Sequence, residues 1–283
     1  MTRIAASSRG EARVRVLRLV RRGDRHDPRE LTVSFKLEGD FEPDFVEGRS
    51  DSSLPGEALK NLVYRITREQ GAREIETLGL SLAAEVLRRH DRLTRVRVEL
   101  AEQPWQRLEA GGKTQYQAFV SGSAEQRLAT VTTNGEQTSV VAGIQDLILM
   151  RSAGFAPPRL NAEIPDDSGV SDGLQPLLVG SLSARWTYTS GDVTFDVYRR
   201  GIRAAILDSF AWHQSQSVQH LLYAIADVVL VTCEEIADVT LTFHERPYRP
   251  ADLFTAGTEN PGELFLVVEE PIGTVQVTVE RST

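Results

Sequence analysis

Histidine and cysteine are the residue types in this chain most able to bind a metal or attack a substrate. The five histidines are His26, His90, His213, His220 and His244. His213 and His220 stand seven positions apart with no carboxylate between them, and none of the five has a second ligand at the spacing that zinc sites use. The sequence therefore predicts no metal site, and it predicts histidines that lie on the surface or are bonded locally.

The single cysteine, Cys233, follows the apolar run Val228–Val231. A chain with one cysteine forms no internal disulfide, which fits a reducing compartment. Cys233 has no histidine beside it to activate a thiolate, so we expect a buried, unreactive thiol rather than a nucleophile.

Familiar cofactor motifs are missing from the sequence. Residues 110–114 resemble the end of a phosphate-binding P-loop, but Arg107 stands where that motif needs its first glycine. The sequence also has no GxGxxG, GxSxG or CxxC motif. We therefore expect any chemistry here to proceed without a bound nicotinamide, flavin or metal.

Composition narrows the class of protein. The chain has 283 residues, 41% of them hydrophobic and 25% charged, with a net charge of −8. Nucleic-acid binding wants a basic face, so an acidic chain argues against it. No apolar run is long enough to cross a membrane, and the ends resemble neither a secretory signal nor a peroxisomal address. These features predict a cytoplasmic protein.

The first half of the chain predicts strands, then two helices, then strands again. A polar turn over residues 21–29 is expected to join the first two strands. Apolar side chains at helical spacing predict helices through residues 59–66 and 75–86. Alternating apolar residues predict strands at 13–20, 31–37, 96–100, 116–121, 127–133 and 139–142.

The second half predicts the same order of elements. Helices are expected through residues 198–210 and 218–229, each with one apolar face. Strands are expected at 183–188, 193–197, 239–243, 264–268 and 275–279. The repeated order predicts an α+β duplication of antiparallel sheets with helices on one face. The Pro-, Asp- and Gly-containing stretch 156–175 separates two modules, 1–150 and 151–283.

Sheets of this kind leave open edges, and an open edge pairs readily with another copy. Closure into a barrel would satisfy those edges. We therefore expect a homo-oligomer.

Several segments together give the chain a resemblance to the urate oxidase (uricase) family. They are Val14–Val16, Leu59–Asn61, Glu102–Glu109, Tyr116–Phe119, Gly143–Leu147, the region of Phe155, Trp186, Asp192–Phe195 and Ser217–Gln219. The resemblance implies tandem tunnelling-fold (T-fold) modules, a homotetramer with active sites at subunit interfaces, and an oxidase that uses dioxygen without a cofactor.

The family holds a flat purine anion and controls its protons. Phe155 matches the stacking phenylalanine of that family, and packing in a core is its alternative role. Val218 and Gln219 match a substrate-facing Val-Gln pair at a helix start. Gln219 could bond the amide-like edge of a heterocycle, and an exposed or capping helix residue is its alternative role.

Other positions of the family's site have changed. Its catalytic lysine aligns with Glu11, its Thr-Asp pair with Gly56-Glu57, and its urate-clamping arginine near Pro176. Its asparagine and histidine align near Glu245 and Pro247, and a shift of one or two residues would bring His244 into the site.

These changes replace cations with carboxylates. An anion beside Glu11 and Glu245 would be repelled, and neither Pro nor Glu replaces a bidentate arginine. We therefore expect poor binding of the urate anion and better binding of a neutral or cationic planar heterocycle. The alternatives are that the glutamates are solvated surface charges, or that Arg9, Arg159, Arg246 or Arg249 restores positive charge.

Three functions remain open on the sequence. The first is a divergent oxidase acting with dioxygen on a purine-like or other heterocycle. In it, Glu57 or Glu11 would be the base, with His244, while Phe155, Val218, Gln219 and Glu245 would bind the ring. The second is urate oxidation with a rearranged site. The third is a binding or scaffold protein that kept the fold and lost the chemistry.

Overall fold

The computed structural model describes residues 4, 6–48, 56–70, 74–152, 177–253, 260, 262–268 and 273–281. Contacts between residues divide the chain into two compact units, Met1–Ile144 with Thr187–Val197 and Gln145–Trp186 with Tyr198–Thr283. Phe155 and Pro176 lie outside the described residues. The division of the chain into modules 1–150 and 151–283 stays a prediction.

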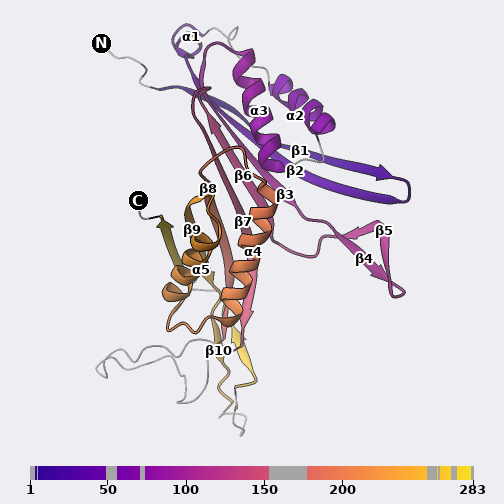
Figure 1. Ribbon diagram of the computed structural model, residues 1–283, viewed down its shortest axis with the longest axis vertical. Helices are drawn as coiled ribbons and strands as arrows, with labels where there is room; N and C mark the ends of the chain where they lie inside the picture. The colour runs from indigo at the N-terminus through magenta and orange to yellow at the C-terminus, as the bar shows by residue number, and fades with distance from the viewer. Residues whose placement is uncertain are drawn as a thin grey trace. The chain divides into compact units, whose positions relative to one another are not determined.

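The first unit places helices against an antiparallel sheet (Figure 1). Its strand order is β1-β2-β3-β6-β7, and α2 and α3 contact β1, β3 and β6. The elements are β1 (Ser8–Arg22), β2 (Arg25–Gly39), α1 (Glu42–Val46), α2 (Gly56–Gln70), α3 (Ile75–Arg89), β3 (Leu93–Gln103), β4 (Gln106–Ala110), β5 (Lys113–Val120), β6 (Gln126–Thr133) and β7 (Thr138–Arg151). The last seven residues of β7 belong to the second unit.

The second unit repeats this arrangement. Its strand order is β7-β8-β9-β12, and α5 contacts β9 and β12. The elements are β8 (Leu178–Tyr188), α4 (Phe195–Trp212), α5 (Val218–Thr232), β9 (Ile236–Glu245), β10 (Tyr248–Pro250), β11 (Phe265–Val267) and β12 (Thr274–Glu280). The prediction of an α+β fold with antiparallel strands and helices on one face is confirmed.

Apolar alternation explains why the helices pack where they do. Leu31, Val33, Phe35 and Leu37 on β2 are all buried, and the residues between them are not. Leu59, Leu62, Val63 and Ile66 on α2 are likewise buried, as are Leu78, Leu82 and Val86 on α3. Burying both stripes between helices and sheet removes them from water, which is the main stabilising contribution to this core.

Two expected elements differ from the structure. Residues 193–197 were expected to form a strand because Val193, Phe195 and Val197 alternate, but α4 begins at Phe195. The backbone N–H of Phe195 donates to Val193 O (3.0 Å) and that of Val197 to Thr194 O (3.0 Å), so Val193 and Thr194 lead into the first turn of α4. Asp196 in the first turn of the helix is favoured by the helix dipole.

The polar turn expected over residues 21–29 is present, but it is much shorter than predicted. β1 and β2 stay paired to Arg22 and Arg25, and the turn is only Gly23–Asp24. Gly23 has φ +59°, a conformation that glycine adopts without strain. Pro28 lies inside β2 but before Glu30, where pairing with β3 starts, so its missing N–H leaves no ladder bond unmade on that side.

None of the helices in the described part of the chain combines the length and the apolar character that spanning a bilayer requires.

Candidate functional site

A β-bulge turns the Glu11 side chain toward the helices. Val14 pairs with Val33 and Glu11 with Phe35, so β1 uses one more residue than β2 between these pairs. The bulge contains Arg13, which has φ +60°. Its backbone N–H donates to Ser34 Oγ (3.0 Å). Glu11 therefore shares the face of buried Val14, whereas a regular strand would point it the other way.

The Glu11 carboxylate lies against the first residue of α2. A Cβ atom built on Gly56 would stand 2.4 Å from Glu11 Oε2, so any larger residue at position 56 would displace this carboxylate. Glu11 Oε1 lies 3.8 Å from Lys60 Nζ, which in turn lies 3.3 Å from Glu57 Oε1. The hydrogen bond and charge of Glu57, followed by the charge of Glu11, raise the pKa of Lys60.

The sequence interpretation did not single out Lys60. The signal was available, because Glu57 and Lys60 are three residues apart on a helix, where side chains meet. Glu57 itself is 77% exposed, whereas Glu11 is 26% exposed. Of these two predicted bases, Glu11 is the one held against the fold.

A small cavity opens at this corner. It measures about 190 Å³ and is lined by Arg9, Gly10, Glu11, Leu37, Phe41, Gly56 and Leu59. Ligand sites for whole small molecules usually exceed about 300 Å³. This cavity is smaller than that usual range. Arg9 lines it, but its Nη1 is paired with Asp44 Oδ2 at 2.7 Å, so Arg9 brings no net positive charge.

The remaining described candidates lie in the second unit, in two places. Val218 and Gln219 begin α5, where Ser217 caps the helix by accepting a hydrogen bond from His220 N (3.1 Å). Val218 is buried and Gln219 is exposed. Gln219 thus has the exposed position that a ligand contact requires, while Val218 anchors the helix start.

His244 and Glu245 end β9. His244 is exposed, and its Nδ1 lies 3.0 Å from Thr274 Oγ1 on β12. The Glu245 N–H donates to Gly273 O (2.8 Å), and its carboxylate would meet a Cβ atom on Gly273 at 3.1 Å. The structure brings Glu11, Gly56, Glu57 and Lys60 together. Among the described residues, no hydrogen bond joins His244 or Glu245 to the start of α5.

None of the histidines, and not the cysteine, lines this small cavity. Among the described residues no group of three or more His, Cys, Asp or Glu side chains is placed to hold a metal ion. His213 is bonded locally to Ser215 Oγ (2.5 Å) and packs edge-on against His220, with ring centroids 5.4 Å apart. Cys233 is buried at the end of α5, as predicted.

Comparison with known proteins supplies the family. The uricase family model matches residues 7–132 and 174–276. The uricase of Arthrobacter globiformis is 28% identical over 96% of this chain and 88% of that protein, and the Danio rerio uricase is 26% identical over 96% and 93%. The crystal structure of Arthrobacter globiformis uricase superposes with a TM-score of 0.88 at 26% identity, covering 99% of this chain and 96% of that one.

These matches span nearly the whole chain and both units. They confirm the resemblance drawn from the sequence segments, and with it the T-fold. The chain belongs to the uricase family.

Proposed function

We propose that this protein is a cofactor-independent oxidase of the uricase type that acts on a planar, purine-like heterocycle other than the urate anion. Family membership supports the oxidoreductase class. The observation that carries the choice of substrate is the Glu11 carboxylate, which lies at the start of α2 where the resemblance expects a lysine.

Charge at this corner favours a neutral or cationic ligand. The cations Arg9 and Lys60 face three carboxylates, Asp44, Glu11 and Glu57, which leaves an excess of one negative charge. A second anion about 4 Å from an unneutralised carboxylate would cost about 1 kcal/mol in water and about 4 kcal/mol near a protein surface. That cost is large enough to lower urate affinity between about fivefold and about a thousandfold.

Glu11 is the group best placed to act as general base. It is half-buried beside Lys60 at the cavity wall, whereas Glu57 is exposed and neutralises Lys60 from outside. In the proposed reaction, the heterocycle loses two electrons and two protons, and dioxygen takes both and leaves as hydrogen peroxide. Glu11 accepts the first proton from a ring N–H.

The second unit of another copy would supply the ring-binding groups. Gln219 would bond a polar ring edge, Val218 and Phe155 would pack on the ring, and His244 and Glu245 would hold water or dioxygen. The 190 Å³ corner is smaller than most small-molecule sites, which favours a site completed by another copy. The proposal includes a homotetramer, as the family resemblance implies, and a cytoplasmic location.

Oxygen consumption tests the proposal directly. The purified protein is supplied with urate and with a panel of neutral and cationic purines, and oxygen uptake, peroxide and substrate absorbance are followed. We expect turnover of a panel member and none of urate. Rapid loss of urate absorbance would instead establish urate oxidation. No oxygen uptake with any compound of the panel would favour the non-catalytic binding protein.

Two variants tie the activity to Glu11. Glu11→Gln keeps the shape but removes the base, so turnover should fall about 10²–10⁴-fold. Glu11→Lys restores the cation that the family uses and should raise urate affinity. Glu99→Gln is the matched control, because Glu99 is 52% exposed on β3 and does not line the cavity.

A further inference from the structure

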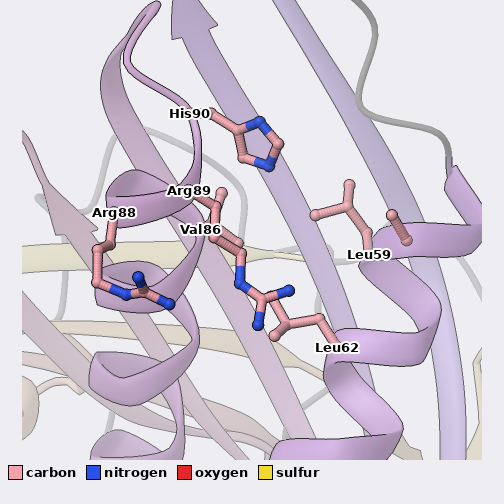
Figure 2. A pocket seen from close by; sticks show the side chains of 7 residues that line it. Leu59, Leu62, Val86, Arg88, Arg89 and His90 are labelled. Atoms are coloured by element: carbon pink, nitrogen blue, oxygen red, sulfur yellow. The ribbon is translucent and has the colours of Figure 1, made fainter.

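A second, larger cavity lies between α2 and α3. Of its lining residues, only Leu59 also lines the cavity at Glu11. We name it the α2–α3 cavity. It measures about 510 Å³, within the usual range for small-molecule sites. Its lining is Ala58, Leu59, Leu62, Val86, Arg88, Arg89 and His90 (Figure 2).

The cavity is apolar on one side and cationic on the other. Leu59, Leu62 and Val86 are the apolar wall, each no more than 5% exposed. Arg88, Arg89 and His90 come from the end of α3, and Figure 2 shows His90 and the Arg89 guanidinium extending toward Leu59 and Leu62. A ligand that fits must therefore bury an apolar body and present an anion at one end.

Each arginine at the cationic end has a nitrogen that its bonds to Glu85 do not use. Arg88 and Arg89 both use Nε and Nη2 on the Glu85 carboxylate, at 2.6–3.0 Å. Among the described residues, Nη1 of either arginine makes no hydrogen bond, and these nitrogens can donate to a bound carboxylate.

Glu85 does not cancel this charge. Its carboxylate also pairs with Arg65 (2.9 Å), which pairs with Glu69 (3.6 Å), so three cations meet two anions. Hydrogen bonds from Arg88 and Arg89 lower the pKa of Glu85, and it stays ionised at neutral pH. Burial, then the charge of Arg89, lowers the pKa of His90, which therefore offers a neutral ring. The positive charge comes from the arginines alone.

We propose that the α2–α3 cavity binds a small amphipathic monocarboxylate, one carboxylate on an aliphatic body of the medium-chain fatty-acid kind. The carboxylate lies between Arg88 and Arg89 near His90, and the chain lies along Leu59, Leu62 and Val86. This site needs no turnover at the Glu11 corner, so its test is independent of the proposed reaction.

Titration calorimetry with decanoate below its micelle concentration tests the binding. We expect saturable binding of one molecule per chain to the full-length protein. Decanol and decyltrimethylammonium, with the same chain but no negative charge, should bind at least tenfold more weakly. Failure of decanoate to bind, or equal binding of decanol, would overturn the proposal.

Matched variants locate the site. Arg89→Gln should weaken decanoate binding at least tenfold, while Arg97→Gln, an arginine on β3 with nearly the same exposure (45% against 46%), should leave it unchanged. Ala58→Phe should block the cavity, while Ala84→Phe adds the same ring to an exposed alanine outside it. Thermal unfolding checks that each variant folds. Undiminished binding to folded Arg89→Gln or Ala58→Phe would overturn the assignment.

Discussion

Two glutamates on the helix-covered side of the first unit show how differently one residue type can be held. Glu76, in the first turn of α3, is fully buried, and its Oε2 lies 2.5 Å from Arg127 Nη2. Glu11 is 26% exposed, and Lys60 lies 3.8 Å away from it. The first carboxylate is enclosed by the fold, while the second stays within reach of a ligand.

The environment of Glu76 is that of a structural ion pair. Arg127 Nη1 also lies 3.7 Å from both Glu102 and Asp196. Glu76 Oε1 and Arg127 Nε are buried without a hydrogen-bond partner among the described residues, so the network is incompletely satisfied. A pair of this kind adds little net stability, but cutting it is costly because one charge is left buried alone.

Arg127→Met is therefore expected to have the largest effect. It should lower the free energy of unfolding by about 3–5 kcal/mol, since Glu76 loses the cation that it pairs with. Urea denaturation followed by circular dichroism measures this change. Arg97→Met, which cuts an exposed pair with Glu99, is the control and should change stability by less than about 1 kcal/mol. Equal losses in both variants would show that burial of Glu76 does not matter.

The pH dependence of stability is the second test of Glu76. Burial raises its pKa above the ordinary 4.5 despite the opposing effect of Arg127. The folded state then binds the proton more tightly than the unfolded state does. This stabilisation is complete below pH 4.5 and is lost as pH rises through the folded-state pKa.

Glu76→Gln removes that titration. The wild-type minus variant difference in unfolding free energy should fall as pH rises above 4.5 and then level off. Urea curves at a series of pH values measure it. A difference that grows with pH would mean that Arg127 outweighs burial and that the pKa of Glu76 is lowered.

Sequence patterning predicted the fold well where apolar residues repeat. The helical stripes of α2 and α3 and the alternation along β3 and β9 follow directly from burial of one face. It failed at residues 193–197, because three alternating apolar residues satisfy a strand and a turn leading into a helix equally well. The pattern also made the turn at Gly23 too long, since exposed paired strands need no apolar alternation.

The candidate site was less accessible to sequence reasoning. Glu11 could be named from the resemblance. The direction of its side chain depends on the bulge at Arg13, which no local sequence pattern predicts. The role of Gly56 depends on its distance from a side chain more than forty residues earlier in the chain. The arginine end of the α2–α3 cavity follows from the packing of two helices, although Arg88, Arg89 and His90 are adjacent in the sequence.

Gly56→Ala tests whether the position of Glu11 matters. The new methyl would lie 2.4 Å from Glu11 Oε2 and must push the carboxylate away. We expect turnover of the panel substrate to fall at least tenfold, with a stability change within about 1 kcal/mol because alanine also favours the helix. Gly201→Ala in α4, where a Cβ meets nothing within 4 Å, is the control and should leave turnover unchanged. Normal turnover in Gly56→Ala would remove Glu11 from the proposed mechanism.

Lys60→Met removes the cation of an exposed ion pair, as Arg127→Met removes the cation of a buried one. Lys60 is 36% exposed, and both Glu11 and Glu57 reach water, so these carboxylates stay solvated after the change. The expected loss of stability is several times smaller than for Arg127→Met, because an exposed ion pair contributes little. Urea denaturation measured on both variants in the same buffer gives the ratio. A loss as large as that of Arg127→Met would mean that Glu11 is held as tightly as Glu76, and a carboxylate held that tightly would be structural rather than available as a base.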